Sequence, residues 1–574
     1  MRAAIAIITL ALFAGAAAPA PAAGKDGRTW YVSASADPGG DGARGAPLDS
    51  LRRVERVSRR QDTIVILPSP RRTPPLDGGL ALKPRQRLVG AGKPVRRQRP
   101  RRRSPRITNT DPSRHDGDGV VLARGTTVRN LEIEGTVRGG IYGVNVANVK
   151  IARNDVSDHN VSCTEGFHIP EFVVPTTVPG AGIPITEGLA NGWAGIMVDA
   201  ARGKRRLRVV GNRVHHADCG DGIDVRASGR ARVRAEIDRN VVTDLRQGEA
   251  FESVLAIGLQ TRDRSRLVAT LDRNRQVNLG NEEDPGVLVL GADSEGVFAN
   301  LDGPSRMRVT VTRNRYENPR ELGGFSANGV EMVNMGDGAR ARMTIRDSSF
   351  TATPGDILEL LNFGAGGRLT MTLKRVTASR SVGFGNTVVI PGNNGDCLLV
   401  GNGAAGGDLS ATVRDSELTN CANNGITIGS NVVQGGDGPA AAMRLDVDRS
   451  EVSGNRGSNL LAGAFNELGH LDVKIEDSDL SDSRGAPGIG VANVAFEDLG
   501  NTASSRIDLG GGALGSRGGN CLEGGPLAAN VLGYDVSAES NWWGAEGGPG
   551  PGRTVTAGGS LDTDPSLSAP APSC

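Results

Sequence analysis

The sequence predicts an all-β protein, a right-handed parallel β-helix of about a dozen rungs with a cap at each end. Three observations lead to this fold class. A short alternating segment that ends in Asn or Ser recurs along most of the 574 residues, and a second apolar segment, usually opened by Gly, lies inside each period. The chain also contains 82 Gly and 30 Pro, the two poorest helix formers, so we expect almost no helix.

The first repeated segment alternates apolar and polar residues, as a strand with one buried face does. It closes on a residue that tolerates turn conformations, and successive closing residues lie mostly 28, 34 or 40 residues apart. These closing residues are Asn154, Asn212, Asn240, Asn274, Asn314, Ser348, Ser416, Ser450 and Ser478. We expect one continuous inner column formed by Ile151, Val209, Ile237, Leu271, Val311, Ile345, Val413, Val447 and Ile475.

The second segment predicts another strand in each coil, with like strands stacked into parallel sheets. Aligned on the opening Gly, these segments place the residue two positions later on the outer surface of every coil. That outer column reads Tyr142, Met197, Asp224, Gly258, Leu288, Glu331, Glu359, Leu399 and Thr427.

The termini and the repeats divide the chain. An initial Arg2 and an apolar, Ala-rich run indicate a secretory signal peptide, so we expect an extracellular or cell-surface protein. No later apolar run reaches about 18 residues, which predicts no membrane span. The predicted parts are a signal peptide at 1–23, a cap with entry strands and a basic loop at 24–117, coils at 118–510 with an inserted loop at 159–194, and a C-terminal cap at 511–574.

Six cysteines in an exported chain indicate disulfides, which persist in oxidising compartments. Six cysteines allow 15 connectivities. We expect the pairs that lie close in sequence, which are Cys163 with Cys219, Cys397 with Cys421, and Cys521 with Cys574. The sequence has no CxxC motif and no Cys/His cluster at zinc spacing, which favours a structural role.

The Asn-closed segments, such as 148–156, resemble rungs of the pectin-lyase-like β-helix superfamily, in which stacked turn Asn residues form a ladder. Thr29-Trp-Tyr-Val-Ser33 is similar to the entry strand of secreted bacterial members, and Ser540-Asn-Trp-Trp-Gly544 is similar to a C-terminal signature of many such proteins. The resemblance implies the fold and leaves the activity open. The Gly-His-Gly and Arg-Ile-Lys motifs of polygalacturonase-like enzymes and the Trp-Ile-Asp-His motif of pectate lyases are missing.

Glu331 and Glu359 are the first candidate catalytic pair. They lie 28 residues apart in matching segments, so we expect them to stack one rung apart, at roughly 5 Å, with Asn334 and Asn362 beside them as substrate-binding residues. Carboxyls this close favour proton sharing or a bound cation, and the spacing suits a retaining glycosidase. The alternative is a solvated pair of surface charges.

The insertion at 159–194 and the coil after it carry the second candidate site. A Trp can stack on a sugar ring, and His or Asp can move protons. The candidates are His168, Trp193, His215, His216 and Asp221 for substrate binding, with Asp224 as a third catalytic acid. The alternative is a cap pinned by a disulfide, with surface histidines.

The charge balance and the composition limit the classes of molecule that the protein is expected to bind. The 66 Lys and Arg nearly balance the 64 Asp and Glu, which predicts no nucleic-acid partner. The basic run Arg96–Arg103 is either an arm for acidic polymers or a solvated loop. No cofactor has a defined site, and Ca²⁺ is the one candidate ion. Acidic turns such as 282–284 could offer oxygen ligands, but they match no calcium-binding pattern, so we assign them to the surface.

These observations give one leading function and one alternative. We expect a secreted monomer whose lateral groove binds an extracellular polysaccharide or cell-wall glycan and, if the protein is an enzyme, cleaves it as a lyase or glycoside hydrolase. The alternative is a non-enzymatic structural or adhesive solenoid at the cell surface. The aromatic content of only 3% favours this alternative.

Overall fold

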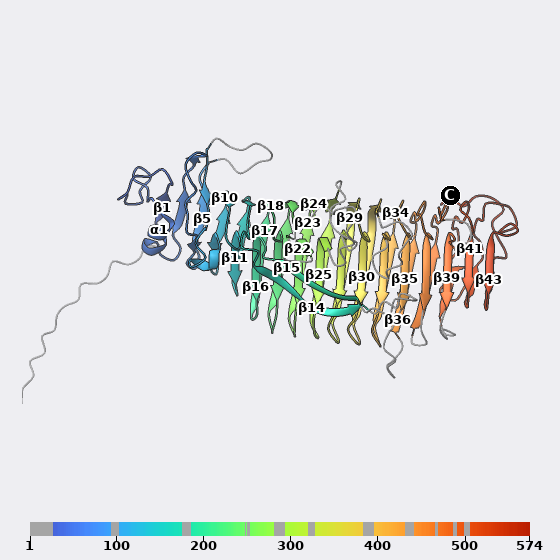
Figure 1. Ribbon diagram of the computed structural model, residues 1–574. Helices are drawn as coiled ribbons and strands as arrows, with labels where there is room; N and C mark the ends of the chain where they lie inside the picture. The colour runs from blue at the N-terminus through green and yellow to red at the C-terminus, as the bar shows by residue number, and fades with distance from the viewer. Residues whose placement is uncertain are drawn as a thin grey trace, which may run out of the picture.

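The structure, a computed structural model, describes residues 27–92, 103–174, 185–246, 248, 253–280, 293–318, 328–382, 395–430, 441–464, 469–485, 491–498 and 505–574. It is a rod of stacked coils, with the first and the last described residues at opposite ends of the stack (Figure 1). The expected signal peptide and most of the Arg96–Arg103 run lie outside the described residues.

Each coil contributes one strand to a front sheet, which faces the viewer in Figure 1. Fifteen strands stack in this sheet among the described residues, more than the dozen rungs expected. They are β4 (Leu80–Ala81), β8 (Val120–Val121), β11 (Ile141–Val144), β16 (Ile196–Ala200), β19 (Ile223–Ala227), β22 (Ser253–Thr261), β25 (Asp293–Leu301), β28 (Val330–Asn334), β30 (Leu358–Asn362), β32 (Leu398–Asn402), β35 (Ile426–Ser430), β37 (Leu460–Ala464), β39 (Val494–Asp498), β41 (Ala529–Leu532) and β43 (Thr554–Ala557).

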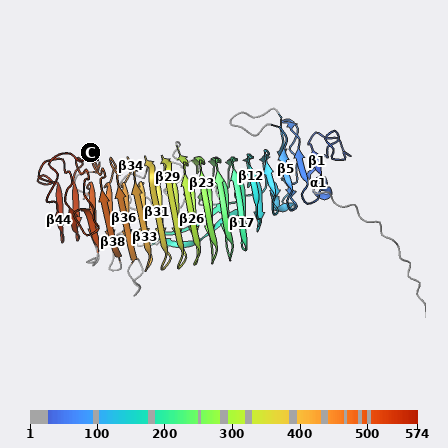
Figure 2. The same ribbon diagram turned by 180° about the vertical axis from the view of Figure 1, so that it is seen from behind.

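The chain then crosses to a back sheet, seen in Figure 2. Its first strands are β1 (Thr29–Val32), β2 (Thr63–Ile66), β5 (Arg87–Gly90), β9 (Thr127–Arg129), β12 (Val149–Ala152), β17 (Lys204–Val210), β20 (Arg232–Asp238), β23 (Arg266–Asp272), β26 (Arg306–Thr312), β29 (Arg340–Thr351), β31 (Arg368–Ser379), β33 (Asp408–Arg414), β36 (Ala441–Asp448), β38 (Gly469–Glu476), β40 (Arg506–Gly510), β42 (Asp535–Ala538) and β44 (Ser560–Asp562). After a turn, many coils add a shorter strand to the same sheet: β7 (Arg106–Ile107), β10 (Glu132–Glu134), β13 (Asp155–Ser157), β18 (Arg213–Ala217), β21 (Val241–Leu245), β24 (Arg275–Leu279), β27 (Arg315–Glu317) and β34 (Glu417–Thr419).

The turn between the two back-sheet strands contains the expected Asn ladder. Asn154 Nδ2 donates to Asn212 Oδ1, and Asn212 Nδ2 donates to Asn240 Oδ1, each at 3.0 Å. The same position is Ser in later coils, where Ser416 N donates to Ser450 Oγ at 3.2 Å. These side chains are almost completely buried, so their hydrogen bonds satisfy turn groups that water cannot reach.

The predicted inner column is confirmed. Ile151 pairs with Val209, Val209 with Ile237, and the register continues coil by coil to Ile475, with Leu373 filling the coil between Ile345 and Val413. All nine predicted residues are buried in one continuous core. The low helix content is also confirmed, because α1 (Leu51–Val57) is the only α-helix in the described part of the chain, beside one short 3₁₀ turn at His115–Gly117.

The three expected disulfides are present: Cys163–Cys219, Cys397–Cys421 and Cys521–Cys574. The first ties the inserted segment to the following coil, and the third ties the C-terminal residue to the last coils. Among the described residues no helix has the length and apolar character needed to cross a bilayer.

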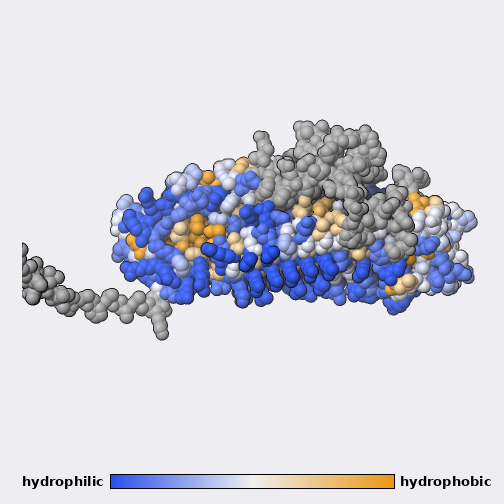
Figure 3. Space-filling model, turned by 90° about the horizontal axis from the view of Figure 1, so that it is seen from below, coloured by the Kyte–Doolittle hydropathy of each residue, from blue (hydrophilic) through white to orange (hydrophobic). Residues whose placement is uncertain are grey.

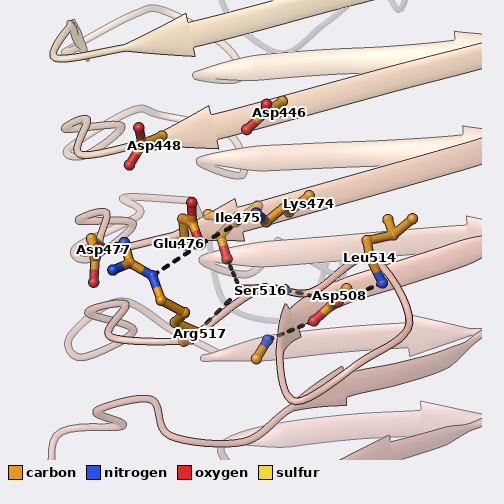
Figure 4. A network of polar contacts seen from close by, with 12 residues as sticks. Asp446, Asp448, Lys474, Ile475, Glu476, Asp477, Asp508, Leu514, Ser516 and Arg517 are labelled. Atoms are coloured by element: carbon orange, nitrogen blue, oxygen red, sulfur yellow. Dashed lines mark hydrogen bonds and ion pairs between the residues drawn. The ribbon is translucent and has the colours of Figure 1, made fainter.

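Strand pairing extends into both expected caps. In the N-terminal segment, β1 pairs with β2 and β2 with β5, so the stack already includes part of 24–117. At the other end, the loop that follows β40 is fixed to its own coil and to the preceding one (Figure 4), and the stack continues beyond it to β44. Leu514 N donates to Asp508 Oδ2 at 2.8 Å, and Arg517 Nη2 pairs with Asp477 Oδ2 at 2.6 Å.

Candidate functional site

The outer face of the front sheet carries the predicted column, with one correction. Asp224 pairs in register with Gly258, Gly258 with Phe298, and Phe298 with Glu331. Phe298 therefore occupies the place that the sequence assigned to Leu288, which lies outside the described residues. The apolar segment at 286–290 resembles the other strands, but β25, which begins at Asp293, supplies this coil.

Glu331 and Glu359 face each other on adjacent strands, because β28 and β30 pair with Glu331 opposite Glu359. Neighbouring strands lie about 4.8 Å apart, which agrees with the expected stacking. Both side chains are buried, at 5% and 2% exposure, so they are not a pair of solvated surface charges. Asp224 lies in the same column, three coils away.

Two further carboxyls accompany the glutamate pair. Asp356 lies just before β30, and its Oδ1 accepts a hydrogen bond from the backbone N–H of Asp396 at 2.5 Å. Burial and the neighbouring Asp396 raise the pKa of Asp356 well above its usual range. Burial also raises the pKa of Asp396 to about 6. Sequence reasoning missed both residues, because they precede the strands and do not recur in every coil.

Asn334 lies opposite Asn362 on the adjacent strand, as expected, but neither side chain is exposed for substrate binding. They close their strands with side chains that are fully buried, and Asn334 Nδ2 donates to Asn362 Oδ1 at 2.7 Å. Asn362 Nδ2 continues the row by donating to Asn402 Oδ1 at 2.7 Å. We therefore assign them to a second internal ladder and leave them out of the binding surface.

The inserted segment is a β-hairpin, where the sequence predicted a loop. Its strands β14 (Glu165–Val174) and β15 (Ile185–Gly192) pair antiparallel. They run along the rod, over the strands of the front sheet, toward β30 (Figure 1). The base of the hairpin is fixed to the sheet, because Asn191 pairs with Ser253 and the guanidinium of Arg226 donates to the carbonyl of Gly166. The side chain of His168 lies outside the described residues.

Trp193 begins the next coil at the base of this hairpin. Its ring packs edge-on against Tyr142, with centroids 5.1 Å apart, and the Arg138 guanidinium lies 4.2 Å from the Trp193 ring centroid. Asp118 fixes Arg138 from the other side, with an Nη2–Oδ2 distance of 2.7 Å. Trp193 and Tyr142 are half-buried, so this aromatic pair is accessible from solvent.

Asp199 connects the aromatic pair to a second arginine. Its Oδ2 accepts a hydrogen bond from Tyr142 Oη at 3.2 Å, and its Oδ1 lies 2.9 Å from Arg226 Nε. Burial raises the pKa of Asp199, although Arg226 opposes the shift. Burial, reinforced by the negative Asp199, raises the pKa of Tyr142 to about 12, so the phenol stays protonated.

Behind Asp199 lies a buried carboxyl pair, Asp221 and Asp224. Asp221 accepts hydrogen bonds from Asn191 Nδ2 at 2.8 Å and from Leu255 N at 2.7 Å. Burial and the neighbouring Asp224 raise its pKa well above the usual range, and burial raises the pKa of Asp224 to about 7. Gly258 allows this packing, because a Cβ there would lie 2.5 Å from Asp224 Oδ1. Near neutral pH the pair therefore holds a proton between two carboxyls.

The structure places His215 and His216 on β18 of the back sheet, whereas Trp193 packs against the front sheet. His215 contacts Asp155 of β13. A different histidine, His159, lies beside the carboxyl pair, with its Nε2 2.7 Å from the carbonyl of Asp221. Burial lowers the pKa of His159 to about 4, so its ring is neutral at physiological pH.

One group of side chains in the described residues has the spacing of a metal site: Cys521, Glu523 and Cys574. The two cysteines are joined in a disulfide, and Glu523 accepts a hydrogen bond from Trp542 Nε1 at 2.7 Å. This group is therefore a structural contact at the C-terminal end.

Neither a family model nor a curated protein matches the chain. Among solved structures, a DFA-IIIase from Arthrobacter chlorophenolicus A6 in complex with GF2 is similar at 12% identity and a TM-score of 0.35, covering 94% of this chain and 99% of that one. Pectate lyase Pel9A is similar at 10% identity and a TM-score of 0.25, covering 84% and 79%. The fold rests on the strand registers, which are parallel and in step between successive coils. The chain is a parallel β-helix.

The β-helix thus brings together three of the expected site residues: Trp193, Asp221 and Asp224. Sequence reasoning missed Arg138, Asp199 and Arg226, although one signal was available. Asp199 and Arg226 pair in register two positions beyond the predicted column, so they belong to a second outer column that the same alignment contains.

Proposed function

We propose that the protein binds an extracellular polysaccharide at the outer face of the front sheet, with Trp193 and Tyr142 as the sugar platform. The proposal rests on a half-buried aromatic pair that contacts charged groups. The Arg138 guanidinium lies over the Trp193 ring, and Asp199 accepts a hydrogen bond from the Tyr142 phenol. Such a surface stacks on a sugar ring and orients its hydroxyls with few polar groups.

The same surface contains the groups that cleavage would need. Asp199 is the least buried of the three carboxyls, and its raised pKa suits proton donation to a glycosidic oxygen. Asp224 interacts with Asp199 from behind, and its pKa of about 7 allows it to take up and release a proton at working pH. Asp199 would touch the substrate, whereas Asp221 and Asp224 would act through it.

A secreted setting accompanies this proposal. The three disulfides fit an oxidising compartment, which agrees with the signal peptide that the sequence predicts. The alternative remains a surface solenoid that binds a glycan without cleaving it. The aromatic platform is common to both functions, whereas a proton-donating Asp199 is required by cleavage alone.

A glycan-array screen of the mature protein, followed by assays for reducing ends and for unsaturated uronates, tests the proposal. We expect binding to one glycan class. Replacing Asp199 by Asn should remove turnover while retaining binding, because Asn still accepts the Tyr142 hydrogen bond. Binding without either product in the wild type would support the adhesive function, and binding to no glycan would contradict the proposal.

The buried pair Glu331 and Glu359 gives a separate prediction. If this pair is the acid/base or cation site expected from the sequence, Glu331→Gln will abolish turnover or Ca²⁺ binding. In either case it removes one of two facing acids, so the free energy of unfolding should stay the same or rise by up to about 1 kcal/mol. Activity assays, calcium titration and thermal melts check these outcomes. Unchanged turnover in Glu331→Gln, with turnover lost in Asp199→Asn, would place the chemistry at Asp199.

A further inference from the structure

The back sheet carries rows of exposed cations along the edge where each coil enters it. Six consecutive strands each begin with a basic residue, and each of these residues pairs in register with the first residue of the adjacent strand. They are Lys204, Arg232, Arg266, Arg306, Arg340 and Arg368. Two positions later a second row contains Arg206, Arg234, Arg308 and Arg342, with Val268 on the coil between. All ten cations are exposed. We call these ten side chains the cation ladder.

The ladder forms a regular grid on a flat surface. Successive coils lie about 4.8 Å apart and the two rows about 7 Å apart, so six coils span roughly 24 Å. A row of hydroxyls runs beside the second row, again in register: Thr270, Thr310, Thr344, Thr372 and Thr412. Strongly hydrophilic residues line this side of the rod in regular rows (Figure 3).

None of the ten cations forms an ion pair with a carboxylate in the part of the chain that the structure describes. Arginines at the opposite edge of the same sheet, beside the turn, are paired: Arg313 with Asp272, Arg375 with Asp347, and Arg449 with Asp415. The C-terminal coils show the same pairing, with Arg517 against Glu476 and Asp477 (Figure 4). One edge of the sheet is therefore neutralised and the other is not.

This difference has a physical cost. Like charges directly opposite each other on adjacent strands destabilise a sheet, and the ladder repeats that arrangement over six coils. The row ends at Asp408, which is in register with Arg368 and is the first acid in the row. A continuous stripe of uncompensated cations is expected where an anionic ligand supplies the missing charge.

We propose that the cation ladder binds a linear acidic polysaccharide that lies along the rod axis. A polymer with one carboxylate per sugar presents charges at intervals comparable with the spacing of the coils, and the Thr row can hydrogen-bond its hydroxyls. A nucleic acid is a poorer match, because the two rows contain no aromatic side chain on which bases could stack. The surface lies on a different sheet from Trp193 and goes beyond the proposed function.

The test uses polygalacturonate, which has one carboxylate per sugar, with dextran as the neutral polymer. The ladder variant is R266Q/R306Q/R340Q. The matched variant R273Q/R313Q/R375Q removes three acid-paired arginines, hence the same charge, from the other edge of the same sheet. We expect the wild type to bind polygalacturonate and not dextran, with affinity that falls steeply between about 50 and 200 mM salt. The ladder variant should bind polygalacturonate with an affinity at least about tenfold lower than that of the wild type. The matched variant should have nearly the affinity of the wild type.

Thermal melts give a second readout, because removing facing like charges should leave the ladder variant as stable as the wild type or more stable. Equal losses of affinity in the two variants would show only a net-charge effect and would overturn the proposal. Equal or tighter binding of single-stranded DNA would overturn the polysaccharide assignment. The Trp193→Ala variant should keep ladder binding, so this proposal and the proposed function can fail separately.

Discussion

Replacing Trp193 by Ala should remove most of the glycan affinity of the front sheet. The ring is half-buried, packs edge-on against Tyr142 and is the platform on which Arg138 lies. An aromatic anchor at the centre of a binding surface is often worth about 2 kcal/mol or more, which corresponds to roughly 30-fold in Kd. Titration with the glycan selected on the array, followed by calorimetry or fluorescence, measures the loss.

A second variant distinguishes the loss of sugar stacking from a loss of folding stability. Trp193→Phe keeps an aromatic face and should retain most of the affinity, whereas Trp193→Ala should not. Melting temperatures of both variants should stay close together, because the ring is only half-buried. Wild-type affinity in Trp193→Ala would show that sugars do not bind at this pair.

Replacing Asp224 by Asn should make the protein more stable at pH 8 and change the pH dependence of its stability. Burial raises the pKa of Asp224 to about 7, whereas an unfolded Asp titrates near 3.9. Between those values the folded state binds more protons than the unfolded state, so stability falls as pH rises from about 4 to 7. Asn imitates the protonated acid and avoids this cost, which amounts to at most about 4 kcal/mol above pH 7.

Thermal melts of both proteins from pH 4 to pH 8 check this expectation. The two curves should nearly coincide at pH 4 and separate as pH rises, with the variant melting higher. Asp472 is a control of opposite sign. Burial alone would raise its pKa, but Arg506, with an Nη2–Oδ2 distance of 2.6 Å, and His470 hold the pKa below its usual range. Asp472→Asn should therefore lose stability near neutral pH, and that loss should fade as pH falls. A variant of Asp224 that melts lower than the wild type at pH 8 would contradict the assigned pKa.

The fold was predictable because its determinants are local and repeated. Alternation fixes which face of each strand is buried, and a closing Asn or Ser fixes the turn, so the columns of Ile237 and Asn240 follow from spacing alone. The assignment of Leu288 to the outer column failed for the same reason. Two apolar segments, 286–290 and 293–301, have the same local pattern, and only long-range pairing with Gly258 selects the second.

The candidate site was predictable only in part. Asp224 and Glu331 recur at a fixed place in the coil, so alignment found them. Asp199 lies two positions beyond the predicted column, and Arg138 lies before β11, outside the repeated strands. The hairpin and the Cys163–Cys219 disulfide bring Trp193 against Tyr142, and neither contact has a periodic signal in the sequence.

The most direct test of the central claim is a crystal structure of the protein with an oligosaccharide of the class selected on the array. The proposed function predicts a sugar ring stacked on Trp193, with a hydroxyl or glycosidic oxygen within hydrogen-bond distance of Asp199. An oligosaccharide that occupies only the cation ladder, or only the surroundings of Glu331, with the Trp193 face empty, would contradict it.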